Sequence, residues 1–172
     1  MIPDISGQEV YILGSGPTLD DHDIDSITQP CFILNSIIKY VKPKGLIFWC
    51  LLDRQEAKRH QQIPVFHWGF VSSWAAKTLE KQGFPMSRFT QWYKNSDIIT
   101  KPGTVTPTTH QAIKLGISKI NYIGYGGEGF AKRLGPPYSE RKWTGVEQTY
   151  FPTQLETAIN LCIESKINYE IL

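Results

Sequence analysis

Short apolar runs constrain the fold of this chain most. Six runs occupy residues 10–13, 31–34, 46–52, 64–68, 120–123 and 169–172. In several of them, such as 46–52, every residue is apolar. A strand that is apolar on consecutive residues has no side that suits water, which is typical of a parallel sheet covered on both faces. The runs therefore predict the strands of a buried sheet.

Helical patterns separate several of these runs. Residues 72–82 predict one helix, and Thr106-Pro107 predicts the start of another because threonine caps helices and proline suits their first position. A third helix is expected to open near Pro152. Alternating strands and helices predict an α/β fold. We expect residues 1–172 to form a single Rossmann-like domain, with a mostly parallel sheet and helices on both faces.

Composition narrows the class of protein. The chain has 172 residues, of which 41% are hydrophobic and 20% charged, as in globular domains. A net charge of +2 does not favour a nucleic-acid partner or a membrane surface. The longest apolar run is far shorter than the roughly 20 residues that span a bilayer. Cys31, Cys50 and Cys162 lie in apolar runs and match no zinc spacing, which predicts reduced thiols and a cytoplasmic location.

A glycine-rich loop follows the first run. A strand that ends in glycines before a helix can leave backbone N–H groups free to bind an anion, commonly a phosphate. The dinucleotide fingerprint would need glycine where Leu19 stands, and no Gly-Lys-Ser/Thr closes a P-loop. An ordinary tight turn is the alternative interpretation. The nucleotide-binding prediction here concerns Gly14, Ser15, Gly16, Pro17 and Thr18.

Polar residues that follow the other runs are further candidates, because ligands of parallel sheets bind beyond the carboxyl ends of the strands. Asn35 and Ser36 follow the second run, and the Asn35 amide could bond a ribose or base, or cap a helix. Asp53 could hold a metal or a ribose hydroxyl, or cap a helix. Gly103-Thr104 precedes a helix and could bind phosphate or only cap it. Tyr125 follows the fifth run.

The segment 124–145 is the one long irregular stretch of the sequence. Loops of this length in small domains often act as lids. Four basic residues in it could close over phosphates or simply face water: Lys132, Arg133, Arg141 and Lys142.

His67 and Trp68 are expected at the binding edge, at the end of the fourth run. The four histidines have no metal-ligand spacing, so no metal site is predicted from them.

The order of these motifs resembles a known group of proteins. The glycine loop, Asn35-Ser36, Gly103-Thr104-Val105 and Ile120-Asn-Tyr-Ile-Gly124 follow one another as in the small bacterial sialyltransferases. They are also similar to domain family of unknown function 115, which includes archaeal hydroxymethylpterin diphosphokinases. The resemblance implies that nucleotide, phosphate or donor sugar is contacted by Gly14, Ser15, Gly16, Asn35, Ser36 and Thr104.

Two departures from that group concern the catalytic residues. The acidic residue expected soon after the fifth run is missing or displaced to Glu128, and no histidine follows His110. Sugar transfer needs a base for the acceptor hydroxyl and stabilisation of the departing phosphate. Glu128, Asp53 and His110 are candidates for the base by their chemistry. The hydroxyls of Tyr125 and Tyr138 are candidates for phosphate contacts.

Three functions fit these residues. The first is a nucleotide-dependent transferase, a sialyltransferase-like glycosyltransferase that uses a nucleotide-sugar donor, an unidentified acceptor and no required metal. The second is a diphosphokinase-like enzyme that uses ATP and Mg²⁺ held by Asp53 and Asp20-Asp21. The third is a nucleotide-binding module without catalytic activity.

Overall fold

A parallel sheet forms the centre of the computed structural model, which describes residues 1–91, 103–136, 138 and 140–172. In this part of the chain seven strands pair in the order β5-β4-β3-β2-β1-β6-β7, all parallel. They are β1 (Glu9–Leu13), β2 (Cys31–Leu34), β3 (Ile47–Leu51), β4 (Trp68–Val71), β5 (Phe89–Gln91), β6 (Lys119–Ile123) and β7 (Asn168–Ile171). The predicted α/β fold with a parallel sheet is confirmed.

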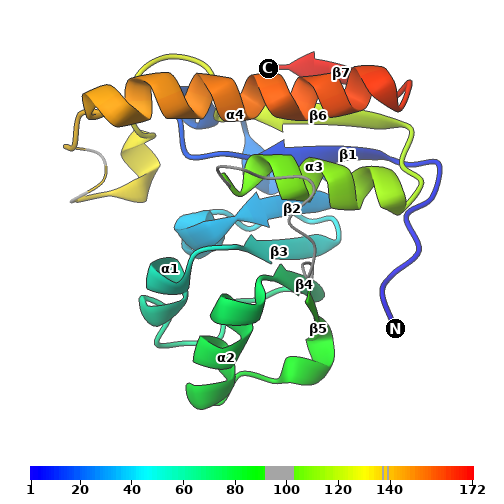
Figure 1. Ribbon diagram of the computed structural model, residues 1–172, viewed down its shortest axis with the longest axis vertical. Coiled ribbons are helices and arrows are strands. Elements are labelled where there is room, and N and C mark those ends of the chain that lie inside the picture. Colours follow the sequence, from blue (N-terminus) through cyan, green and yellow to red (C-terminus); the bar gives the residue numbers. More distant parts are fainter. Residues whose placement is uncertain (92–102, 137, 139) are drawn as a thin grey trace.

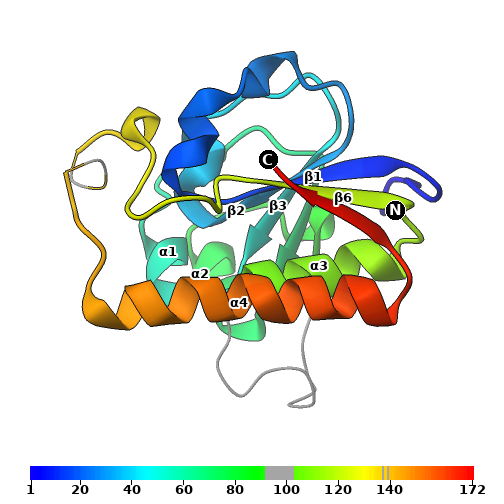
Figure 2. The same ribbon diagram turned by 90° about the horizontal axis from the view of Figure 1, so that it is seen from above.

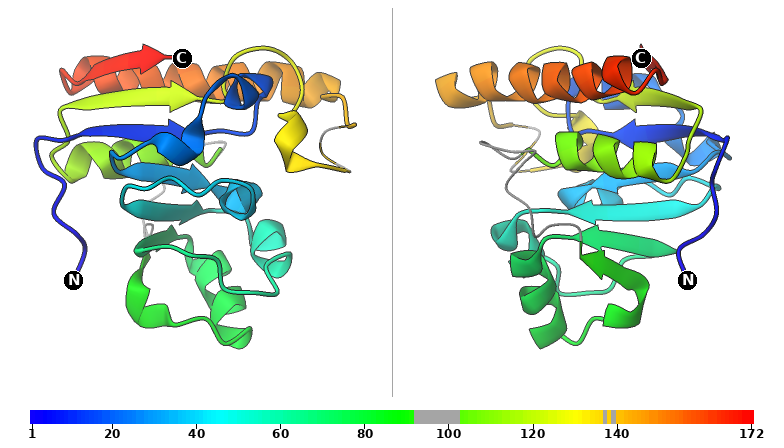
Figure 3. Two further views of the ribbon diagram at one scale, coloured as in Figure 1. Left: turned by 180° about the vertical axis from the view of Figure 1, so that it is seen from behind. Right: turned by 45° about the vertical axis from the view of Figure 1, so that its right-hand side comes forward.

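The strand order turns at β1. The chain steps outward from β1 through β2, β3 and β4 to β5, and then returns to place β6 on the other side of β1. Leu13, at the end of β1, is consequently in register with both Ile33 of β2 and Ile123 of β6. The two edges of the sheet are β5 and β7 (Figure 3). In such sheets the point where the order turns is where ligands bind.

Different kinds of helix cover the two faces of the sheet near β1. The α-helices α3 (Val105–Lys114) and α4 (Gly145–Glu164) lie side by side on one face (Figures 1 and 2). On the opposite face the chain forms the 3₁₀ helices η1 (Pro17–Asp21) and η2 (Ile24–Ser26) (Figure 2). The remaining helices are η3 (Asn35–Lys39), α1 (Arg54–Lys58), α2 (Ser73–Lys81), η4 (Met86–Arg88) and η5 (Lys132–Leu134).

The fourth strand lies further along the chain than predicted. It spans Trp68–Val71 instead of 64–68, and His67 precedes it. The Ile47 N–H donates to His67 Nδ1 at 2.9 Å, and the His67 N–H donates to the Ile47 carbonyl at 2.9 Å. Since Ile47 begins β3, His67 and Trp68 lie at the amino edge of the sheet. Their predicted place at the binding edge is wrong.

Two helix starts also differ from the prediction. Thr104, not Thr106, is the cap residue of α3, and α4 begins at Gly145 with Pro152 inside it. Thr144 and Glu147 form a capping box, in which the Glu147 N–H donates to the Thr144 hydroxyl and the Thr144 N–H donates to the Glu147 carboxylate. This reciprocal pair starts α4 earlier than a proline-based prediction allows. The short strand β5 was not predicted at all.

A cluster of aromatic side chains packs around Trp49 in the core. Trp49 of β3 is fully buried, and its ring centroid lies 4.6 Å from that of His60. The Trp49 indole N–H donates to the Asn35 carbonyl at 2.9 Å, so this cluster also fixes the chain where β2 ends. Neither ring nitrogen of His60 has a hydrogen-bond partner in the described part of the chain.

His60 predicts how stability depends on pH. Burial, and to a smaller degree the charge of Lys39, lowers the His60 pKa from 6.5 to about 4. Between these values the unfolded chain binds a proton that the folded chain does not, so the free energy of unfolding should fall as pH falls from about 6.5 to about 4. Urea unfolding across that range should show a shallower pH dependence for His60→Phe than for the wild type. An equal pH dependence of the unfolding free energy in His60→Phe and the wild type would contradict a lowered His60 pKa in the folded protein.

Candidate functional site

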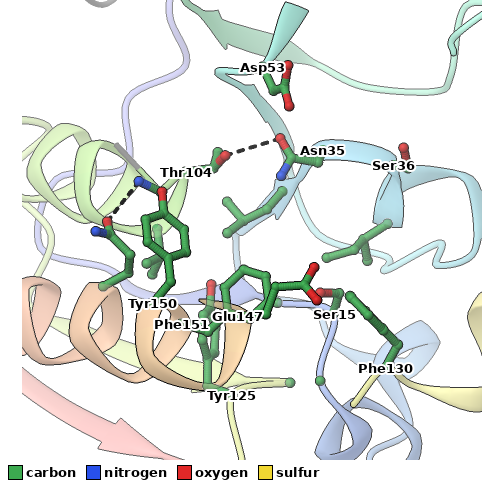
Figure 4. Close-up of a pocket in the computed structure, with 18 of the residues that line it drawn as sticks. Ser15, Asn35, Ser36, Asp53, Thr104, Tyr125, Phe130, Glu147, Tyr150 and Phe151 are labelled. Atoms are coloured by element: carbon green, nitrogen blue, oxygen red, sulfur yellow. Dashed lines mark hydrogen bonds between the residues drawn. The ribbon is translucent and has the colours of Figure 1, made fainter. Parts of the chain in front are cut away.

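A cavity of about 870 Å³ opens at the carboxyl edge of the sheet. The ends of β1, β2, β3 and β6 lead into it, and the start of α3 and the part of α4 from Glu147 to Ile159 form further walls. Figure 4 shows Tyr150 and Phe151 of α4 on one side and Phe130 of the segment 124–145 on another. A cavity of this volume with an aromatic lining and a few polar groups is typical of small-molecule sites.

Most predicted site residues lie in the wall of this one cavity. The residues that do are Gly14, Ser15, Gly16, Asn35, Ser36, Asp53, Gly103, Thr104 and Tyr125. Pro17, Thr18, Glu128 and His110 do not line it. Glu128 is exposed on the loop after β6, and His110 is in the middle of α3. Two of the three base candidates are therefore away from the cavity, and Asp53 is the one that lines it.

The glycine loop packs directly against the loop after β6. The Gly14 N–H donates to the Ile123 carbonyl and the Gly16 N–H donates to the Gly124 carbonyl, both at 2.7 Å. A Cβ atom on Gly14 or Gly16 would lie 2.7 Å from the Gly124 oxygen. The expectation that these two N–H groups face an anion is wrong, because both are already bonded within the protein. Ser15 keeps an N–H group without an acceptor among the described residues.

The residues that follow the glycines hold neighbouring loops together. The Thr18 hydroxyl accepts hydrogen bonds from the Gly124 and Gly126 N–H groups at 3.1 and 3.3 Å. The Asp20 carboxylate forms an ion pair with Arg133 at 3.0 Å and accepts from the Lys132 N–H group. Burial raises the pKa of Asp20, but these hydrogen bonds outweigh it and leave the pKa lowered. These side chains serve the packing of the segment 124–145.

The magnesium ligands of the diphosphokinase hypothesis are not brought together. Asp53 lines the cavity, whereas Asp20 and Asp21 do not. Within residues 1–91, 103–136, 138 and 140–172 there is no group of three His, Cys, Asp or Glu side chains that could hold a metal ion.

Asn35 is held in the cavity by both its backbone conformation and its side chain. Its φ of 50° lies in the left-handed region, where asparagine is one of the few tolerated residues. The Thr104 hydroxyl donates to Asn35 Oδ1 at 3.2 Å (Figure 4). The side chain does not cap a helix, because the cap position of η3 is Leu34. No described residue accepts from the Asn35 amide N–H₂ group, so this donor is free for a ligand.

The start of α3 offers further donors. Gly103 is held by its N–H group, which donates to Gln154 Oε1 at 2.8 Å. Thr104 and Val105 line the cavity, and the first N–H groups of an α-helix have no acceptor within the helix. The positive end of the helix dipole adds to their preference for an anion. Thr104 makes no side-chain cap, and its hydroxyl is bonded to Asn35 instead.

The wall formed by α4 was missed from the sequence. Glu147, Tyr150, Phe151 and Gln154 line the cavity but lie before or close to the predicted helix start at Pro152. The pattern Thr144-Gly-Val-Glu147 is the signal that could have found them, since it is typical of a capping box. Glu147 pairs with Arg141 in addition to capping the helix, so its carboxylate is already engaged.

Asp53 and two tyrosines add further polar groups to the wall of the cavity. Asp53 Oδ1 accepts from the Gln55 N–H at 2.6 Å and so caps α1, while no described residue donates to Oδ2. Burial, followed by the negative charge of Asp53, raises the pKa of Tyr150. The Tyr125 hydroxyl is buried without a partner among the described residues, and burial raises its pKa well above 10.0.

A connected group of charged side chains lies beside the end of β2. The Ser36 hydroxyl donates to the Glu56 carboxylate, which pairs with Arg59. Arg59 Nη1 in turn donates to the Tyr138 hydroxyl at 2.6 Å.

The segment 124–145 reaches the cavity through Phe130, Leu134, Tyr138, Arg141 and Trp143, whereas Lys132, Arg133 and Lys142 do not line it. Its action as a lid stays a prediction.

Comparisons with known proteins bear on the fold. No protein-family model matches the chain, and no curated protein sequence matches it. The fold is similar to a structure of the sialyltransferase CstII from Campylobacter jejuni with the substrate analogue cytidine-5′-monophosphate, at a TM-score of 0.54 and 14% identity, covering 97% of this chain and 80% of that one. A structure of the sialyltransferase CST-II with a trisaccharide acceptor and CMP is similar at a TM-score of 0.54 and 16% identity, covering 96% and 81%.

These likenesses support the resemblance to small bacterial sialyltransferases at the level of the fold. The relation to domain family 115 and to diphosphokinases stays a prediction. In the described part of the chain no helix has both the length and the apolar character needed to cross a membrane.

The contact between the two loops can be tested with a matched pair of glycines. Gly124 and Gly83 have φ angles of 81° and 82°, so alanine strains the backbone equally at both. A Cβ atom on Gly124 would also clash with the Gly14 carbonyl oxygen. A Cβ atom on Gly83 would have no heavy atom within 4 Å outside its chain neighbours. We expect Gly83→Ala to lower the free energy of unfolding by about 1 kcal/mol and Gly124→Ala by roughly 2 kcal/mol more. Urea unfolding measures both, and equal losses would contradict the close contact.

Proposed function

We propose that the protein is a nucleotide-dependent glycosyltransferase that binds a nucleotide-sugar donor in the cavity at the carboxyl edge of the sheet. The observation that carries the proposal is the convergence of the Asn35 amide, fixed by Thr104, with the start of α3 in one cavity. The amide suits a ribose or base, and the helix start suits a phosphate. The sialyltransferases of similar fold, which were solved with CMP, support a nucleotide as the ligand.

The chemistry of transfer fits donors that line the cavity. In the transfer step, the acceptor oxygen forms a bond to the anomeric carbon of the donor sugar while the bond from that carbon to the phosphate oxygen breaks. The nucleotide leaves with the electron pair, and hydrogen-bond donors stabilise the negative charge that develops on it. The helix start of α3 supplies such donors. The Tyr150 hydroxyl is another candidate, because its raised pKa keeps it protonated.

We infer that Asp53 takes the proton of the acceptor hydroxyl. Asp53 Oδ1 is held by Gln55 and orients the carboxylate, which leaves Oδ2 to accept the proton. Three other carboxylates line the cavity, those of Glu56, Glu147 and Glu156. Glu56 and Glu147 are less suited because each bonds a basic side chain and another hydrogen-bond donor. No described residue donates a hydrogen bond that would orient the Glu156 carboxylate, in contrast to Asp53. The acid that the family resemblance leads one to expect is missing or displaced to Glu128, which does not line the cavity, and no histidine follows His110. Asp53 would supply the base instead.

Nucleotide binding should depend on the Asn35 amide. We expect Asn35→Ala to weaken binding of CMP, or of whichever cytidine, uridine, guanosine or adenosine nucleotide binds most tightly, by about tenfold, the cost of one polar contact. Isothermal titration calorimetry of the purified protein measures this. Asn160→Ala is the matched control, because Asn160 is exposed on α4 and does not line the cavity. If the wild-type protein binds none of these nucleotides saturably, the proposal is wrong.

Turnover separates an enzyme from a binding module. Release of nucleotide from a nucleotide-sugar donor, dependent on an added acceptor sugar, should fall about 100-fold or more in Asp53→Asn, while the nucleotide still binds. Equal turnover in Asp53→Asn and the wild type would contradict the role of Asp53. Nucleotide binding without any turnover would favour a binding module, and a strict requirement for ATP and Mg²⁺ would favour the diphosphokinase hypothesis.

A further inference from the structure

A second, smaller cavity of about 320 Å³ lies beside the main one. Its wall is formed by Ser36, Lys39, Tyr40, Arg59, Tyr138 and Arg141, and all of these except Lys39 also line the main cavity. We call this smaller cavity the side cavity. A group that projects from a ligand in the main cavity could therefore enter it.

The wall of the side cavity is strongly basic. It contains three cationic side chains, those of Lys39, Arg59 and Arg141, and no carboxylate. The carboxylates that pair with the two arginines are Glu56 and Glu147, and they line the main cavity instead. Lys39 Nζ donates to the Arg59 carbonyl at 2.9 Å and pairs with no carboxylate of the described chain. The side cavity therefore carries an excess of positive charge even after both pairs are counted.

Hydroxyl groups add directional donors to this charge. The Tyr138 hydroxyl accepts from Arg59 and also interacts with the Ser36 hydroxyl, and it carries a hydrogen that it can donate. Burial raises the pKa of Tyr138, so this hydrogen is retained at neutral pH. Guanidinium, ammonium and phenol donors around one space are the groups that bind carboxylates and phosphates.

The side cavity is distinct from the part of the main cavity assigned to the nucleotide. Asn35 separates Ser36 from Thr104 in Figure 4, and the start of α3 lies on the Thr104 side. The side cavity lies on the Ser36 side, because Ser36 lines it and Thr104 does not. A nucleotide phosphate at α3 would leave the basic side chains free for another negative group.

We propose that the side cavity binds a carboxylate or phosphate group carried by a sugar substrate of the transfer reaction. This inference rests on the proposed function, since it takes the nucleotide to occupy the main cavity. The sugar is either that of the donor or that of the acceptor, and its negative group contacts Lys39, Arg59 and Arg141.

Matched pairs of charged and neutral sugars test the proposal. NMR titrations of the whole protein with galacturonate against galactose, and with glucose 6-phosphate against glucose, should show about tenfold tighter binding of at least one charged sugar. Lys39→Gln should remove most of that difference. Lys42→Gln should keep it, because Lys42 is exposed on the same stretch of chain and lines neither cavity. No preference for charge in the wild type, or equal effects of the two lysine variants, would overturn the proposal.

Two further measurements show which sugar binds the side cavity and distinguish this proposal from that of nucleotide binding in the main cavity. If CMP-N-acetylneuraminic acid displaces the charged sugar and CMP does not, the site holds the donor carboxylate; retained binding with this donor present assigns it to the acceptor. If Lys39→Gln weakens CMP binding as much as it weakens binding of the charged sugar, the anion is the nucleotide phosphate and the proposal is overturned. If CMP binds but charged sugars do not, the side-cavity proposal fails alone.

Discussion

The close approach of the glycine loop to the loop after β6 determines the shape of the carboxyl edge of the sheet. Gly14 and Gly16 donate to the carbonyls of Ile123 and Gly124, and no Cβ atom fits at this contact. Thr18 and Asp20 extend the contact to Gly126 and Arg133. The three glycines of this contact, Gly14, Gly16 and Gly124, line the cavity without bringing a side chain into it, whereas aromatic side chains such as Phe130, Tyr150 and Phe151 line other parts of its wall.

This contact changes which groups are available to a ligand. Backbone N–H groups of a glycine loop often bind phosphate, but here those of Gly14 and Gly16 donate to carbonyl groups at the end of β6 and in the loop after it. The donors for a nucleotide come instead from the start of α3 and from the Asn35 amide. Asn35 is held at three points, by its left-handed backbone, by Trp49 at its carbonyl and by Thr104 at its side chain. Such positioning is costly for a residue that serves packing alone and favours a binding role.

The sequence was informative where local patterns decide the structure. Consecutive apolar residues such as those in β2 and β3 predicted buried parallel strands, and the rule for ligands at carboxyl ends predicted that Asn35, Asp53 and Thr104 share a site. It failed where a distant contact decides. Nothing local to Thr18 shows that its hydroxyl bonds Gly124, far along the chain. The α4 wall was missed because Pro152 has the character of a helix start, although a capping box begins the helix earlier.

A crystal structure of the protein with CMP tests the central claim most directly. The account predicts that the nucleotide lies in the main cavity, with its ribose or base within hydrogen-bond distance of the Asn35 amide and its phosphate at the start of α3, beside Thr104. The same structure should show Gly14 and Gly16 still bonded to Ile123 and Gly124. A nucleotide bound outside this cavity, or a phosphate held by the N–H groups of Gly14 and Gly16, would contradict it.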